Sequence, residues 1–259
     1  LNDAFQGPRP DYDYPEGVDE LELPLDGECN VFSAWGNTTA DGRLICGDSQ
    51  DLEEWHQLLL IAFPDKGNNY MATVRAGHLA EHFGMNNKGL FQGASGGYAI
   101  GDIHTGYGIC RSVAYQHLLR FADNATEAKD MFLPWDYPGS TSLHLSDVSG
   151  NAYVIEATSA LKAVRKPGDF GEGDFIVSSN NYWCDEMKEA IKGELQIDLG
   201  GWYARQSGGA RLFHATSRNM GMTTKLQQFA GDVDLDFAKM MWRFTGESPI
   251  KDGWPYDDF

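Results

Sequence analysis

The sequence predicts a layered α+β domain, because strand-like and helix-like segments occur in separate runs along the chain. Short apolar segments divided by turn residues dominate residues 29–75, and helical spacing of apolar residues first occurs at residues 111–122. A second run of strand patterns and a second run of helical patterns follow. Segregated runs of this kind are typical of sheets that carry packed helices.

One large domain is expected for the 259 residues, because neither an internal repeat nor a linker interrupts this pattern. Residues 1–28 are rich in proline and acidic residues, which predicts an extended lead or propeptide-like segment. The domain itself is expected over residues 29–245, with a tail at residues 246–259.

The domain begins with a predicted β-hairpin. Apolar runs at residues 29–36 and 43–47 flank Asp41 and Gly42, and a D-G pair between two such runs is a strong hairpin signal. A second hairpin is expected around the turn at residues 149–151.

The remaining elements follow from the periodicity of apolar residues. Further strands are expected at residues 57–64, 70–75, 142–146, 152–158 and 175–179. Helices are expected at residues 111–122, 185–192, 210–219 and 234–244, with a short one opening near Thr126 and capped by Asn124 or Thr126.

Composition excludes several classes of function. With 38 acidic and 20 basic residues the net charge is −18, which repels nucleic-acid backbones and anionic lipid. No stretch reaches the roughly 18 consecutive apolar residues of a membrane span. We therefore expect neither a nucleic-acid partner nor a membrane span.

The cysteines and two sequons give weaker indications. The four cysteines lack paired C-x-x-C spacing, which argues against a structural zinc site. Asn37 and Asn124 open N-x-[ST] sequons and are candidate glycosylation sites, which slightly favours a secreted or lumenal setting over the cytoplasm.

Two further patterns are weak signals for a metal or a nucleotide. Residues 78–82 match H-x-x-E-H, but Gly77 and Gly84 leave room for barely two helical turns, so a polar loop or strand end is the favoured interpretation. Glycine is dense in residues 84–108 without a phosphate-binding motif, which favours tight turns or backbone close to a ligand. We expect no cofactor and no metal.

Cys29 is the candidate nucleophile, because it opens a predicted strand and Asp51 ends the strand that returns. The alternative is that Cys29 is a small buried apolar residue, as free cysteines usually are. All seven histidines lie far from Cys29 in sequence, so spacing alone assembles no histidine-assisted thiol.

Five segments together resemble the cysteine N-terminal-nucleophile (Ntn) hydrolases. The closest branch is the acyl-CoA:6-aminopenicillanate (isopenicillin N) acyltransferase-like family, peptidase C45, and bile salt (choloylglycine) hydrolases and penicillin V acylases are more distant. The segments are the nucleophile hairpin at residues 28–51, G-M-N-N-K-G-L at residues 84–90, and residues 125–131, 146–156 and 177–182.

The resemblance implies a four-layer αββα sandwich of two antiparallel sheets with helices outside. It implies that autocatalytic cleavage before Cys29 frees an α-amine, which then acts as the base for the Cys29 thiol. Such an amine has a pKa of about 8, far below that of lysine, so no histidine is needed. Asp51 would hold this amine.

The resemblance also implies the groups that stabilise the oxyanion. These are the side chain of Asn180 and a backbone N–H near Ser95 or Gly96. A later arginine of the family best matches Arg211, and the alternatives are Arg205 and Arg218.

Three departures from the family pattern bear on function. Asp48 stands where the family usually has an arginine, and Glu28 stands where cleavage usually follows glycine or another small residue. The family also tends to continue past Phe259 with more strands, so we expect further sequence or a partner chain, and a homo-oligomer stays open.

Two functions follow. The first is an amidohydrolase or N-acyltransferase that cleaves a linear amide through a thioester on Cys29, with a small acyl amide as substrate. The alternative is a non-catalytic family member that serves as a structural or binding subunit.

Overall fold

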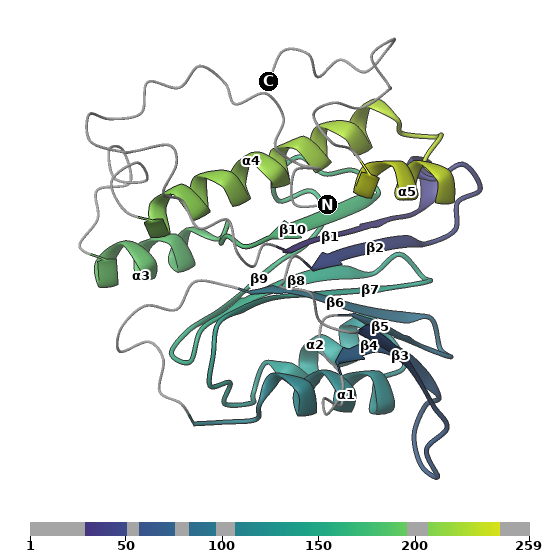
Figure 1. The fold of residues 1–259 in the computed structure, drawn as a ribbon, viewed down its shortest axis with the longest axis horizontal. Helices are drawn as coiled ribbons and strands as arrows, with labels where there is room; N and C mark the ends of the chain where they lie inside the picture. Colours follow the sequence, from purple (N-terminus) through teal and green to yellow (C-terminus); the bar gives the residue numbers. More distant parts are fainter. Residues whose placement is uncertain (1–28, 51–56, 76–82, 97–106, 196–206, 244–259) are drawn as a thin grey trace.

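The computed structural model describes residues 29–50, 57–75, 83–96, 107–195 and 207–243. Over these residues the chain forms two antiparallel sheets that face each other, with helices on their outer sides (Figure 1). This is the predicted α+β arrangement. The lead at residues 1–28 and the tail at residues 246–259 lie outside the described residues.

The small sheet has three strands in the order β10-β1-β2. Its strands are β10 (Phe175–Ser179), β1 (Cys29–Ala34) and β2 (Ile45–Gln50). The predicted hairpin of β1 and β2 is confirmed, with a 3-10 turn (Gly36–Thr38) between the strands. β10, from a distant part of the chain, pairs with the other edge of β1.

The large sheet has seven strands in chain order. They are β3 (Gln57–Ala62), β4 (Tyr70–Arg75), β5 (Gly84–Asn86), β6 (Leu90–Gly96), β7 (Thr141–Asp147), β8 (Ala152–Ala157) and β9 (Lys162–Arg165). The sequence patterns predicted all of these except β5, β6 and β9. The H-x-x-E-H segment lies outside the described residues.

Helices cover both outer faces. α1 (Arg111–Phe121) and α2 (Ala125–Phe132) pack on the large sheet, while α4 (Ser207–Gln228) and α5 (Leu235–Arg243) pack on the small sheet (Figure 1). α3 (Asp185–Leu195) lies beside β9. α4 is much longer than the predicted helix at residues 210–219. No helix in the described part of the chain has both the length and the apolar character to cross a membrane.

The two helical layers bury separate apolar cores. Beneath the large sheet, side chains such as Tyr115, Leu118 and Phe132 pack against the strands, and above the small sheet Phe32 and Met222 do the same. Asn124 caps α2, because its Oδ1 accepts a hydrogen bond from the Glu127 N–H at 2.9 Å. The candidate site lies between the sheets, where polar side chains such as Ser33 and His144 meet.

The glycines of β6 show why the sequence pattern hid this strand. A Cβ built on Gly93 would lie 2.7 Å from Val31 Cγ1 and 3.0 Å from Asp48 Oδ2, so the two sheets approach too closely for a side chain. Gly89, with φ of +84°, forms the turn that leads into β6. The glycine-dense segment is thus partly turn, as expected, and partly strand.

Candidate functional site

Cys29 is the first residue of the central strand of the small sheet. Side chains alternate along a strand, so Cys29, Val31 and Ser33 face the large sheet while Asn30 and Phe32 face the helices. The contacts agree, because Val31 lies against Gly93 of β6 and Ser33 Oγ lies 2.7 Å from Ser146 Oγ of β7. The Cys29 side chain is buried, with 4% of its surface exposed.

Asn180 meets the backbone nitrogen of Cys29. The Cys29 N–H donates to Asn180 Oδ1 at 2.6 Å, and Asn180 Nδ2 donates to the Gly96 carbonyl at 2.9 Å. A backbone hydrogen bond from Gly96 also reaches the Cys29 thiol. Three of the predicted site residues therefore gather at one point, where β1, β6 and the end of β10 meet.

Arg218 of α4 completes this group. Its Nη1 donates to the Cys29 carbonyl at 3.0 Å and to Asn30 Oδ1 at 2.6 Å, and its Nη2 donates to Asn180 Oδ1 at 3.2 Å. The guanidinium thus holds both Cys29 and Asn180 in place. Of the three candidate arginines, the structure places Arg218 beside Cys29.

The other predicted residues have varied positions. Asp51 and Arg205 lie outside the described residues, as does the side chain of Arg211, whose backbone belongs to α4. Ser95 Oγ donates to the Ser179 carbonyl at 2.7 Å, which ties β6 to β10 beside the site.

The two sequon asparagines lie at the protein surface. Asn37 is exposed in the 3-10 turn, and Asn124 is half-buried at the start of α2. The described residues contain no group of three or more histidine, cysteine, aspartate or glutamate side chains placed to hold a metal ion.

Asp48 lies diagonally across the β-ladder from Cys29. It pairs with Val31 in register, and its Oδ2 accepts a hydrogen bond from the Ala94 N–H at 3.3 Å. Among the described residues Asp48 Oδ1 has no hydrogen-bond partner, and neither has Nε2 of Gln50, the cross-strand partner of Cys29. The sequence identified Asp48 as unusual but gave no reason to single out Gln50.

Electrostatics make the Cys29 thiol a poor nucleophile in the continuous chain. Burial raises its pKa to about 11, and the Asp48 carboxyl contributes to the rise. The Gly96 hydrogen bond and the charges of Arg111 and Arg218 oppose it. Burial also raises the pKa of Asp48 well above its usual range. No sequence pattern pointed to Arg111, which opens a helix far along the chain.

Replacement of Asp48 by asparagine should lower the pKa of Cys29. Burial is the largest cause of the raised pKa and stays in place, so in the uncleaved chain we expect a value between about 11 and the ordinary 9.0. The rate of iodoacetamide alkylation at Cys29, followed by peptide mass spectrometry across pH, measures this shift. Asp130→Asn on exposed α2 is the control, and an unchanged pH midpoint in Asp48→Asn would show that Asp48 does not act on the thiol.

A buried polar network joins the two sheets beside the site. His144 Nε2 lies 2.8 Å from Ser33 Oγ, its Nδ1 lies 3.1 Å from Ser178 Oγ, and Cys46 Sγ lies 3.3 Å from Ser33 Oγ. Burial lowers the pKa of His144 to about 3, and Arg165 adds to this effect. His144 therefore stays neutral and ties the sheets together through its two ring nitrogens.

This histidine should make the fold sensitive to acid. In the unfolded chain the His144 side chain is protonated below about pH 6.5, whereas in the folded chain it is protonated only below about pH 3. The free energy of unfolding therefore falls as the pH drops from 6.5 to 3. Between pH 6.5 and pH 5 the loss is about 2 kcal/mol. Urea unfolding at both pH values should show that His144→Asn, which cannot titrate, lacks this part of the loss. An equal loss in both proteins would exclude His144 as its source.

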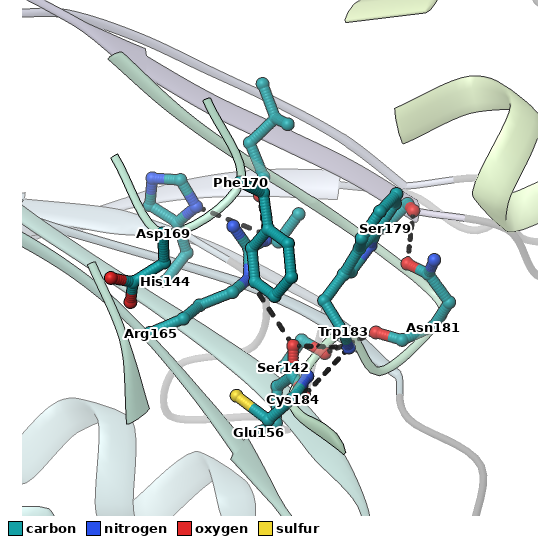
Figure 2. Close-up of polar contacts among 12 residues, drawn as sticks. Ser142, His144, Glu156, Arg165, Asp169, Phe170, Ser179, Asn181, Trp183 and Cys184 are labelled. Carbon is teal, nitrogen blue, oxygen red and sulfur yellow. Dashed lines mark hydrogen bonds and ion pairs between the residues drawn. The ribbon is translucent and has the colours of Figure 1, made fainter. Parts of the chain in front are cut away.

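The chain that follows Asn180 is held by a buried ion-pair cluster (Figure 2). Glu156 accepts hydrogen bonds from the backbone N–H groups of Trp183 at 2.8 Å and Cys184 at 2.9 Å, and its Oε1 lies 3.4 Å from Arg165 Nε. Arg165 Nη1 also donates to Glu172 Oε1 at 3.0 Å. Burial raises the pKa of Glu156, whereas Arg165 acts to lower it. Glu156 is thus well placed to fix the turn that presents Asn180.

Comparisons with known proteins show the fold. No family model matches the chain, and no curated protein matches its sequence. Among solved structures, a mutant of the conjugated bile acid hydrolase of Clostridium perfringens has a TM-score of 0.55 at 17% identity, covering 83% of this chain and 78% of that one.

A second solved structure gives the same result. The Caenorhabditis elegans ortholog of N-acylethanolamine-hydrolyzing acid amidase has a TM-score of 0.56 at 14% identity, covering 86% of this chain and 88% of that one. These neighbours have the Ntn-hydrolase fold, and the two facing antiparallel sheets with outer helices agree with it. The chain therefore has the predicted αββα architecture.

Proposed function

We propose that the protein is a cysteine Ntn amidohydrolase that cleaves a linear amide through a thioester on Cys29. The observation that carries this proposal is the setting of the Cys29 backbone nitrogen, held 2.6 Å from Asn180 Oδ1 at the start of a central strand. If the preceding bond is cleaved, this nitrogen becomes an α-amine beside the thiol. One solved neighbour is a conjugated bile acid hydrolase and the other is an ortholog of N-acylethanolamine-hydrolyzing acid amidase, which supports the same kind of reaction.

Activation would be a self-cleavage. Cys29 Sγ attacks the carbonyl carbon of Glu28, the bond to the Cys29 nitrogen breaks, and that nitrogen takes the thiol proton. Water then hydrolyses the thioester, which leaves the Glu28 carboxylate, a free α-amine and a free thiol. Before this step the nitrogen is an amide and cannot serve as a base for the thiol.

Turnover would use the same groups. The α-amine takes the proton of the Cys29 thiol, and the sulfur attacks the acyl carbonyl of the substrate. An N–H of Asn180 and the backbone N–H of Gly96 would stabilise the oxyanion, at roughly 2.7–4 kcal/mol for one such donor. The α-ammonium returns the proton to the leaving amine as the C–N bond breaks. Water, or an amine in the case of acyl transfer, then takes the acyl group from the sulfur.

Asp51 is proposed to hold the α-amine and tune its protonation. Asp51→Asn should slow self-cleavage, because the amine that forms would lose its counter-charge. Quantifying the fragment that begins at Cys29 over time, in wild type and variant, measures this rate. Wild-type rates in the variant would remove Asp51 from the mechanism.

Hydroxylamine trapping tests the thioester itself. The protein is incubated with a panel of N-acyl amides and hydroxylamine, which converts an acyl-enzyme thioester into a hydroxamate. We expect hydroxamate from at least one amide and, in a parallel sample quenched with acid in the absence of hydroxylamine, an acyl mass increment on the peptide that contains Cys29. An increment on another residue would contradict the proposed nucleophile.

The second candidate function is a non-catalytic structural or binding subunit. Asp48 supports it, because a carboxyl near Cys29 raises the thiol pKa. A thiol-directed acyl probe separates the two functions, because a reactive Cys29 is labelled quickly near neutral pH and an inert one is not.

A further inference from the structure

The large sheet extends beyond the described strands of the small sheet. β2, the edge strand of the small sheet, contacts β6 of the large sheet. β5, β4 and β3 follow β6 in order toward one edge of the large sheet, at the end opposite β9 (Figure 1). We call the face of these three strands on the side of the small sheet the ledge.

Side-chain exposure shows that the described strands of the small sheet leave the ledge uncovered. Four successive cross-strand partners on β6, β5, β4 and β3 share this face: Phe91, Met85, Met71 and Ile61. The ring of Phe91 meets that of His144 between the sheets, and 4% of Phe91 is exposed. Exposure then rises to 37% for Met85, 47% for Met71 and 56% for Ile61. The face that is buried at β6 therefore opens to solvent from β5 to β3.

The ledge is apolar. Its described side chains, none of them charged, are Leu59, Ile61, Met71, Thr73 and Met85. The chain as a whole carries a net charge of −18. A contiguous exposed apolar patch on such a chain marks an interaction surface.

β3 is an edge strand without the usual protection of an edge. Within the described residues it pairs with β4 alone, and it contains no charged residue, whereas β9 at the opposite edge contains Lys162 and Arg165. Charged residues commonly keep a free edge from pairing with another chain. Five consecutive apolar residues, from Leu58 to Ala62, are instead typical of a strand that is covered on both faces.

A second copy of the chain has the shape that fits the ledge. Each copy has a step, because the described small sheet ends at β2 while the layer below continues for three more strands. Rotation by 180° about an axis parallel to the strands, midway between the two layers, turns one step into its complement. Each ledge then covers the other, and β2 of each copy lies beside β3 of its partner in the same layer.

The strand directions allow these edges to pair. Six residues join the end of β2 at Gln50 to the start of β3 at Gln57. Their reach of about 25 Å is largely used in crossing between the layers and over the width of the ledge, so β3 begins near the end of the sandwich at which β2 ends. β2 and β3 therefore run in opposite directions. The rotation preserves strand direction, so the paired edges would be antiparallel.

The surface is large enough for a stable dimer. The ledge is three strands wide and up to six residues long, which is roughly 14 by 20 Å, and the two free edges are each roughly 10 by 20 Å. Together they present on the order of 700 Å² per copy, close to the roughly 800 Å² per partner of a typical specific interface. Contact at uncharged side chains also brings two acidic chains together where repulsion is weakest.

We propose that the protein forms a two-fold symmetric dimer in which the ledges of two copies pack face to face and β2 of each copy pairs with β3 of the other. This inference concerns assembly and does not rest on the proposed chemistry at Cys29. In the dimer Met71, on the middle strand of the ledge, lies close to Met71 of the partner subunit.

Sedimentation velocity of the full chain, from about 1 to 100 µM, tests the dimer. We expect wild type to sediment as a dimer at the upper end of this range. Met71→Glu should weaken dimerisation at least about a hundredfold, because two carboxylates would face each other in an apolar interface. Val164→Glu is the matched control, since Val164 is an exposed apolar residue on β9, the opposite edge strand of the same sheet. Its dimerisation should be unchanged.

Cross-linking tests the geometry. Met71→Cys is made together with Cys110→Ser, which removes an exposed native thiol. Bismaleimidoethane is a short linker that suits thiols on packed sheets about 10 Å apart. We expect it to join two copies through residue 71, as a covalent dimer on a denaturing gel. Val164→Cys in the same background should stay monomeric on the gel.

Two results would overturn the proposal. One is a wild-type monomer at every concentration. If alkylation of Met71→Cys in that monomer became faster after removal of residues 244–259, the tail would be the segment that covers the ledge. The other is a dimer that Met71→Glu leaves intact and that the linker does not join at residue 71, because the copies would then meet elsewhere. Sedimentation of wild type needs no variant, so the test stands even if Met71→Glu fails to fold.

Discussion

Cys29→Ala is expected to abolish both self-cleavage and amide turnover, with a loss of at least about 10⁴-fold in kcat. The sulfur is the proposed attacking atom in both reactions, and the alanine methyl group cannot replace it. Intact mass of the purified variant measures self-cleavage, and hydroxamate formation from the best amide substrate measures turnover.

Two other thiols of the described chain, those of Cys46 and Cys110, give matched controls. Cys46 lies on the neighbouring strand, and burial raises the pKa of its thiol to about 11, as it does for Cys29. Cys110 is exposed at the start of α1. Cys46→Ala and Cys110→Ala should keep most of the activity, and substantial activity in Cys29→Ala would contradict the mechanism.

Arg218→Met should lower kcat about a hundredfold or more, with a smaller effect on KM. The substitution removes the hydrogen bonds to the Cys29 carbonyl, Asn30 Oδ1 and Asn180 Oδ1. These buried oxygen atoms would then face an apolar side chain, which is costly. It also removes a charge that lowers the pKa of Cys29, so the pH midpoint of thiol alkylation should rise.

Arg218→Lys distinguishes the charge from the geometry. Lysine keeps the positive charge but lacks the planar fork that reaches Cys29 and Asn180 together. We expect the alkylation midpoint to stay near that of wild type while kcat still falls. Arg43→Met, at an exposed arginine that pairs with Asp41, controls for loss of a charge elsewhere. Wild-type kcat in both Arg218 variants would remove Arg218 from the site.

Local signals explain which strands could be predicted. The hairpin of β1 and β2 follows from apolar runs around Asp41 and Gly42, which are local features. β6 could not be recognised, because Gly93 is required by the close approach of Val31 from the other sheet. β9 has only four residues, and its buried Arg165 is stabilised by an ion pair with Glu172 that no local pattern reveals.

The candidate site was only partly predictable for the same reason. Cys29 and Asn180 came from motifs that resemble a known family, but their contact depends on the pairing of β1 with β10, where Asn30 lies opposite Ser179. The choice between Arg211 and Arg218 depends on which face α4 turns toward β1, and the sequence does not specify this rotation. The sequence did not identify Gln50 or Arg111. Gln50 is the cross-strand partner of Cys29, and the charge of Arg111 acts to lower the pKa of the Cys29 thiol.

The denatured intact mass of the purified protein, with N-terminal sequencing, tests the central claim most directly. The account predicts a fragment whose first residue is Cys29, present in wild type and absent in Cys29→Ala. A single wild-type chain that still carries residues 1–28 after incubation, with no labelling of Cys29 by a thiol-directed acyl probe, would contradict the account. The fold would then be that of a binding or structural subunit.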